Sequence, residues 1–365
     1  MIMPRPRRRR WWLLPPLLFL LVAGLHTAVW RAAAARLSQG FDNWAGERRA
    51  LGWTLRHGTP TRGGWPLHVS LTVPGFDLSG GPRTAPAGLA WQAEKLDLRV
   101  ALLDWDRLVV APSGRQRFEI AGQEYPFAAD RVELTLPLEG GSTPREGVLE
   151  VERLRLNSPW GGFDLRRGSL ALRSRLSATE AEPALSAELR LRELGLPVPG
   201  PGSLGQHMAL VELEGSLSGP LPPIRQPTQR AEAWRDAGGT LDLRRVELRW
   251  GPVTTTLSAT GTLDEALQPM GAGQIQMLGA VEAIEAMVAA GLVSRAASGA
   301  LRAVATLLAR PDPDGGPPLL ELPITLQDRR IGLARLPLVR LPVLEWPPPP
   351  EVPDAARDPS LPGND

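Results

Sequence analysis

The chain has 365 residues, 43% of them apolar, which is enough to build one large domain or two small ones. It has no cysteine, which excludes disulfides, cysteine nucleophiles and thiolate metal sites. Five arginines lie in its first ten residues, and without them 36 Lys and Arg face 39 Asp and Glu. Acidic and basic residues then alternate instead of forming a basic patch, which argues against binding of nucleic acid.

Residues 11–30 form an uncharged segment near the N-terminus. A helix of that length matches the hydrocarbon core of a bilayer, about 30 Å. Arginines precede the segment and Arg31 alone follows it, so the positive-inside rule places residues 1–10 in the cytoplasm and the bulk of the chain in the periplasm. We therefore predict a single-pass inner-membrane anchor set by a basic cluster and interfacial tryptophans: Arg7, Arg8, Arg9, Arg10, Trp11, Trp12 and Trp30.

A cleaved signal peptide is the alternative interpretation of the same segment. A basic start, an apolar stretch and the small residues at 32–35 are all features of a signal peptide. Against it, the apolar stretch is longer than the 7–15 residues usual for a signal, and Arg31 crowds the cleavage position. Both interpretations export the remaining chain.

Residues 31–51 continue as a juxtamembrane helix. Leu37, Phe41, Trp44 and Leu51 follow the 3.6-residue helical period, and Gly52 is expected to end the helix. The apolar stripe should lie against the following domain or against the membrane surface.

From residue 52 to residue 345 the apolar residues recur mostly at every second position, the pattern of strands with one buried and one wet face. Such alternation is typical of antiparallel sheets, because parallel strands have continuous apolar runs. We predict a mainly β fold with an extensive antiparallel sheet, as an open groove, a sandwich or a barrel. The apolar face should include Leu67, Val69, Leu71, Val73, Leu134, Leu136 and Leu257.

Few helices interrupt this pattern. Thr228 is expected to cap a short helix through Trp234, and residues 281–291 and 301–308 should form a helical hairpin before the final strands. The prolines of residues 220–227 mark a candidate break between two lobes. Residues 346–365, with four consecutive prolines and no apolar period, are predicted to be a disordered tail.

The sequence offers little chemistry. The four histidines have no i, i+3 or i, i+4 partner, so no local metal pair is present, and no nucleophile elbow accompanies them. Asp104 and Asp106 flank Trp105 and are a candidate carboxylate pair for a glycosidase, although a turn or strand end explains them better. We expect no catalytic residue, no metal site and no cofactor.

Several motifs carry a resemblance to a known family. They are GWTLRHG at 52–58, GGWPL at 63–67, AWRDAGGTL at 233–241, LRWGP at 248–252 and GTL at 261–263. The chain resembles, from the anchor to about Leu344, the family "domain of unknown function 2125", single-pass envelope proteins mostly of alphaproteobacteria. Arg329 and Arg330 stand where that resemblance leads one to expect a Gly-Arg turn. The resemblance implies no activity.

A more distant, fold-level likeness is to AsmA-type proteins, which are thought to handle phospholipids in Gram-negative envelopes. Three functional hypotheses follow. A closed apolar core predicts a non-enzymatic structural component of the envelope, whose partners are the inner membrane and other envelope proteins. An open apolar face predicts binding or transfer of phospholipid. A hydrolase is the third and least supported hypothesis.

Overall fold

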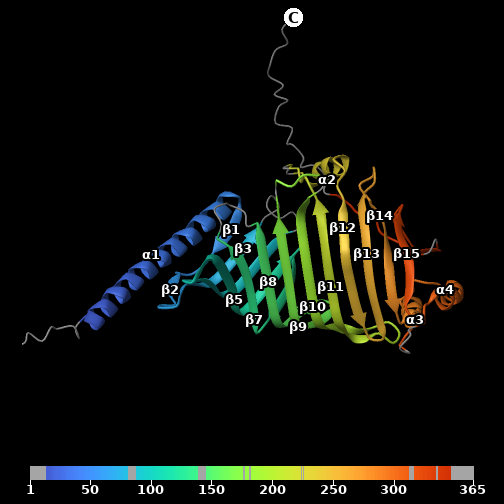
Figure 1. The fold of residues 1–365 in the computed structure, drawn as a ribbon, viewed down its shortest axis with the longest axis horizontal. Coiled ribbons are helices and arrows are strands. Elements are labelled where there is room, and N and C mark those ends of the chain that lie inside the picture. The colour runs from blue at the N-terminus through green and yellow to red at the C-terminus, as the bar shows by residue number, and fades with distance from the viewer. Residues whose placement is uncertain are drawn as a thin grey trace, which may run out of the picture. The chain divides into compact units, whose positions relative to one another are not determined.

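The computed structural model describes residues 14–80, 88–138, 145–175, 177–180, 182–222, 224, 226–311, 316–333 and 336–346. Two compact units make up the chain (Figure 1). Unit 1 comprises residues 1–173, 188–200 and 205–211, and unit 2 comprises residues 174–187, 201–204 and 212–365. Residues 220–227, the candidate lobe break, lie inside unit 2.

Unit 1 begins with one continuous helix, α1 (Leu14–Ala50). Its apolar N-terminal part is exposed all round, and among the described helices it is long and apolar enough to cross a membrane. Its C-terminal half packs on the sheet through the predicted stripe of Leu37, Phe41 and Trp44. The helix ends before Gly52, whose φ of +89° suits glycine. Residues 1–13, including Arg7 to Arg10, Trp11 and Trp12, lie outside the described residues.

The strands of unit 1 pair antiparallel with near neighbours in the chain. They are β1 (Trp53–Arg56), β2 (Thr61–Gly63), β3 (His68–Gly80), β4 (Leu89–Ala101), β5 (Asp104–Ile120), β6 (Gln123–Ala128), β7 (Arg131–Pro137), β8 (Glu146–Ser158) and β9 (Gly161–Ser174). Both β1 and β2 pair with β3, which pairs with β4 and then β5. The sheet continues from β5 through β6 and β7 to β8 and β9.

The apolar face of unit 1 lies under α1. Val69, Leu71 and Val73 of β3 are almost completely buried there, beside Phe76. Further along the sheet, Leu134 and Leu136 of β7 are only half-buried. Leu67 was predicted on the same face, but the structure places it in the turn before β3, where 79% of it is exposed. The period of two extended to Leu67, but the strand starts one residue later, so Leu67 does not share its face.

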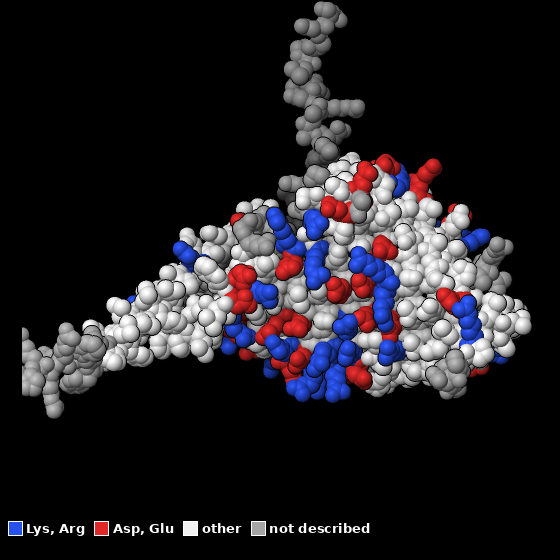
Figure 2. All heavy atoms as spheres, viewed as in Figure 1, with Lys and Arg blue, Asp and Glu red and all other residues white. Residues whose placement is uncertain are grey.

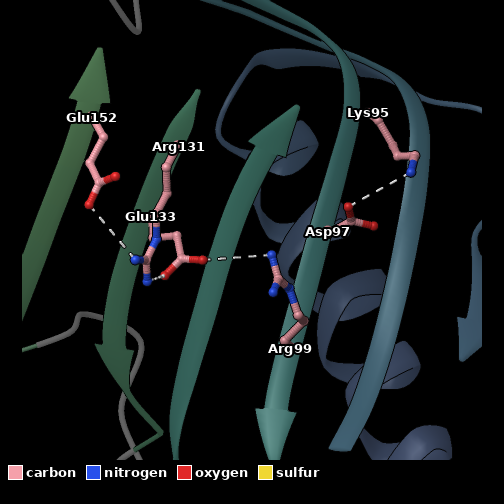
Figure 3. Close-up of polar contacts among 6 residues, drawn as sticks. All are labelled: Lys95, Asp97, Arg99, Arg131, Glu133 and Glu152. Atoms are coloured by element: carbon pink, nitrogen blue, oxygen red, sulfur yellow. Dashed lines mark hydrogen bonds and ion pairs between the residues drawn. The ribbon is translucent and has the colours of Figure 1, made fainter. Parts of the chain in front are cut away.

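The opposite face of unit 1 carries charged side chains. Lys95 pairs with Asp97 on β4, and Arg99 pairs with Glu133, which also binds Arg131 (Figure 3). Figure 2 shows acidic and basic side chains interspersed over much of the face turned to the viewer, with basic side chains gathered near its lower edge. The basic partners are about half exposed and the acidic partners Asp97 and Glu133 are only 21% and 18% exposed. Ion pairs with a solvated partner add about 0–1 kcal/mol each.

In unit 2 each strand from β12 pairs antiparallel with the next one in the chain. The strands are β12 (Leu241–Trp250), β13 (Val253–Leu263), β14 (Pro269–Leu278), β15 (Leu320–Gln327), β16 (Arg330–Leu333) and β17 (Leu336–Arg340). Residues of β10 (Pro183–Gly200) and β11 (Gly205–Ser218) are shared between the two units. Arg329, in the β15–β16 turn, has a φ of +62°, the conformation that a glycine would adopt without strain.

Three helices accompany these strands: α2 (Pro227–Asp236), α3 (Ala280–Ala289) and α4 (Arg295–Leu308). The predicted hairpin is confirmed, since α3 and α4 pack together between β14 and β15 in the chain. The predicted cap of α2 was wrong: Gln226 is the N-cap and Pro227 the first helical residue, a position where the missing N–H costs least. The prediction of a mainly β, antiparallel fold with an apolar N-terminal helix is confirmed.

Candidate functional site

A groove of about 590 Å³ lies on the apolar face of the unit 2 strands. Its lining residues all belong to unit 2, and nearly all of them are apolar or small. They come from β11 to β16, from α2 and the segment before it, and from the segment after β17. Among the larger side chains are Trp234, Leu243, Leu257, Ile324, Leu326 and Trp346.

The floor of the groove follows from strand register. Leu243 of β12 lies opposite Ala259, and Leu257 of β13 lies opposite Ile275. Further along the same face, Gly261 of β13 pairs with Gly271 of β14. The next pair on this face, Ala259 with Gly273, is also small. The face is therefore lower along these two pairs than at Leu257 and Leu263, which lie on either side of them. The groove is therefore a gap in the apolar layer, rimmed by larger side chains.

One end of the groove is closed by α2. Trp234 is 7% exposed, and its Nε1 donates to the carbonyl oxygen of Ser218 at 2.9 Å. Gly239 lies against the indole, so close that a Cβ there would be 2.2 Å from the Trp234 ring. Thr262 of β13 donates to the Gly239 carbonyl at 2.7 Å, which links the loop after α2 to the floor strand.

The segment after β17 adds the second tryptophan. The side chain of Gln268 both donates to and accepts from the backbone of Leu344, at 3.2 and 2.9 Å. Two residues later, Trp346 donates from Nε1 to the carbonyl oxygen of Leu267 at 3.0 Å. These bonds hold Trp346 at the groove, although it is the first residue of the predicted tail; residues 347–365 lie outside the described part of the chain.

The helical hairpin covers the other part of the same strand face. Ile284 of α3 and Leu301 of α4 are buried against Leu320 and Leu322 of β15. Ile275 of β14, which is opposite Leu257 in register, packs against this cluster. The apolar face of unit 2 is thus covered by the hairpin at one place and by α2 at another, with the groove between them.

Arg230 is the charged residue among those that line the groove. It projects from α2, is exposed, and its Nε donates to the carbonyl oxygen of Ile224 at 2.6 Å. That bond fixes the guanidinium beside an apolar cavity. The arrangement can hold an apolar chain with a negatively charged group at its end.

The structure separates the residues predicted for the apolar face. Leu257 lines the groove, whereas Val69, Leu71, Val73, Leu134 and Leu136 belong to unit 1. The sequence interpretation missed Trp234 and Trp346 as lining residues. The signal for Trp234 was present in the motif at 233–241, which the structure brings against the motif at 261–263.

The weak catalytic candidates do not meet in a site. Asp104 and Asp106 are exposed at the start of β5, outside the groove. A hydrogen bond to Asp106 raises the pKa of the Asp104 carboxyl, with desolvation adding to it. His57 contacts Gly58 and Arg49, and His26 contacts Pro66, so these two have separate surroundings. Within the described ranges, no cluster of His, Asp and Glu could hold a metal ion.

Comparison with known proteins identifies a family. Residues 30–342 match the model of a family described as "Uncharacterized protein conserved in bacteria (DUF2125)". No curated protein and no solved structure matches the chain. Because the family match covers most of the chain and agrees with the resemblance seen in its motifs, the protein belongs to the DUF2125 family.

Proposed function

We propose that this protein is a non-enzymatic, inner-membrane-anchored periplasmic protein that binds a phospholipid acyl chain in the groove of unit 2. The observation that carries the proposal is the groove itself: about 590 Å³, lined by apolar side chains and open at the surface. That volume lies within the range of ligand pockets, about 300–1,000 Å³.

Apolar area supplies the affinity in this proposal. Each methylene that leaves water contributes about 0.8 kcal/mol, so a chain of several methylenes in the groove offsets the cost of immobilising it. Leu257 and Ile324 are half-buried, and Leu241 at one edge is 39% exposed, so this part of the face is free to take more apolar contact. Arg230 supplies a positive charge for the phosphate of the headgroup.

The anchor is the second part of the proposal. The exposed apolar half of α1 supports a single membrane crossing, and the N-terminal arginines favour a cytoplasmic N-terminus. A reporter enzyme active only in the periplasm, fused after Leu51, is expected to be active. Carbonate extraction should leave the full-length chain in the membrane fraction. A fusion protein that is made but inactive would overturn the topology, and processing near Ala35 would replace the anchor by a signal peptide.

Photocrosslinking in cells tests the groove. A benzophenone amino acid replaces Leu257 in the full-length protein, and the matched control replaces Ser258, an exposed neighbour on the opposite face of β13. After irradiation, mass spectrometry of the purified protein should find a phospholipid adduct at position 257 and none at 258. Equal adducts at both positions, or none at 257, would contradict the groove and leave a structural envelope role as the better explanation.

A further inference from the structure

Large apolar side chains are exposed together at one end of the unit 1 sheet. Trp65 and Leu67 lie in the turn between β2 and β3, and Leu103 and Trp105 lie at the turn between β4 and β5. Their exposed fractions run from 57% for Trp65 to 102% for Leu103. We name these four residues the apolar edge. Isolated exposed leucines are common, but two tryptophans and two leucines gathered at one end of a sheet indicate a contact surface.

The two turns form one surface because the strands that carry them are paired. His68 lies opposite Ala101, and Ala101 lies opposite Asp104. The backbone nitrogen of Leu102 also donates to the carbonyl oxygen of Leu67, at 3.4 Å. The apolar edge is therefore held by backbone hydrogen bonds and does not depend on a mobile loop.

Helix α1 fixes the apolar edge beside the apolar segment of the chain. His26 contacts the carbonyl oxygen of Pro66 through Nε2 at 2.8 Å, and Trp30 donates from Nε1 to the carbonyl oxygen of His68 at 2.8 Å. Figure 1 shows β2, which precedes this turn, near α1. His26 and Trp30 lie in the last turn of the uncharged segment. This is the part of a spanning helix that leaves the hydrocarbon core for the interface.

We infer that the apolar edge inserts into the periplasmic leaflet of the membrane that α1 crosses. The inference rests on the proposed anchor and adds a second membrane contact, made by the sheet. Tryptophan prefers the interface, where its ring meets acyl chains and its N–H meets water, and leucine side chains favour the layer below. The contact sets the start of β3 at the membrane surface, so the strands of unit 1 rise from the bilayer.

The absence of cysteine makes a site-specific test direct. Leu103→Cys introduces one thiol at a fully exposed position, which can carry an environment-sensitive nitrobenzoxadiazole label without disturbing the core. The matched control is Trp160→Cys, 72% exposed in the β8–β9 turn at the opposite end of the same sheet. Both full-length variants are reconstituted into vesicles of phosphatidylethanolamine and phosphatidylglycerol, with and without a nitroxide quencher on the acyl chains.

The fluorescence of the label at position 103 is expected to shift to shorter wavelength and to be quenched by the lipid nitroxide. The label at position 160 should show neither effect. Leu67→Cys should behave like Leu103→Cys, because both positions belong to the apolar edge. Flotation with the vesicles reports the anchor independently. A protein that floats but leaves the label at 103 as unquenched as the label at 160 would overturn the inference and leave the anchor standing. A protein that does not float would overturn both.

Discussion

The indole of Trp30 in α1 donates a hydrogen bond to the carbonyl oxygen of His68, the first residue of β3, at 2.8 Å. This bond joins the end of the apolar helical segment to the strand whose Val69, Leu71 and Val73 form the buried centre of unit 1. Helix α1 and the sheet are therefore parts of one packed unit, and not a domain on a flexible tether.

Loss of the Trp30 bond should be measurable. Trp30→Phe keeps an aromatic ring but removes the N–H donor, and we expect the free energy of unfolding to fall by about 0.5–1.5 kcal/mol. Urea unfolding of the full-length protein in detergent micelles measures this change in the free energy of unfolding. Trp105→Phe is the control, because Trp105 is 77% exposed and its replacement should change stability by less than about 0.5 kcal/mol. Equal effects of the two changes would show that the bond does not stabilise the unit.

Two glycine substitutions should have opposite effects. A Cβ at Gly239 would overlap the ring of Trp234, so Gly239→Ala should destabilise unit 2 by about 1–3 kcal/mol and disturb the end of the groove. Gly299 lies inside α4 with nothing within 4 Å of the added carbon, so Gly299→Ala should stabilise the protein by up to about 1 kcal/mol. Thermal unfolding of both variants compares them. A neutral Gly239→Ala would mean that Trp234 is not held as described.

Glu247 should make stability depend on pH in the acid range. Its side chain is 3% exposed, and hydrogen bonds from Arg245, with further ones from Arg249, hold the pKa of its carboxyl below the ordinary value. As the pH falls, the Glu247 carboxyl therefore takes up a proton in the unfolded chain before it does so in the folded protein. The stabilisation is complete above the unfolded pKa of about 4.3 and disappears as the pH falls through the lower folded value.

The measurement is urea unfolding of wild type and Glu247→Gln at about pH 6 and at successively lower pH below about 4.3. The advantage of the wild type over the variant should shrink as the pH falls. Glu124→Gln is the control, because the ion pair of Glu124 with Arg117 is about half exposed on both sides and contributes little. A difference between wild type and Glu247→Gln that stays constant with pH would contradict the prediction.

Lipid binding should depend on apolar area and not on a single polar group. Leu257→Asp is expected to abolish recovery of phospholipid, whereas Ser258→Asp, Asp104→Ala and His57→Ala should retain it. Circular dichroism must first show that the Leu257 variant is folded, and Ser258→Asp controls for the added charge on the same strand. An acid or base in an enzyme typically contributes about 10²–10⁴ in rate. A folded Asp104→Ala variant that lost envelope function would therefore indicate a hydrolase.

The sequence by itself determined the elements and their class. An alternation of period two is a local property of each strand, and pairing between strands adjacent in the chain needs only short turns. The antiparallel sheet, the long apolar helix ending just before Gly52 and the α3–α4 hairpin could therefore be predicted. Leu67 marks the limit of that reasoning, because periodicity cannot tell the last residue of a turn from the first residue of a strand.

Only the tertiary structure decided which apolar residues are covered. Alternation is the same whether a second layer packs on the sheet or leaves it open, so Leu71 and Leu257 look alike in sequence, yet one is buried under α1 and the other lines a groove. The groove also depends on contacts between distant residues. Gln268 and Leu344 are separated by 76 positions, and Leu267 and Trp346 by 79. A local sequence pattern does not predict contacts over such separations.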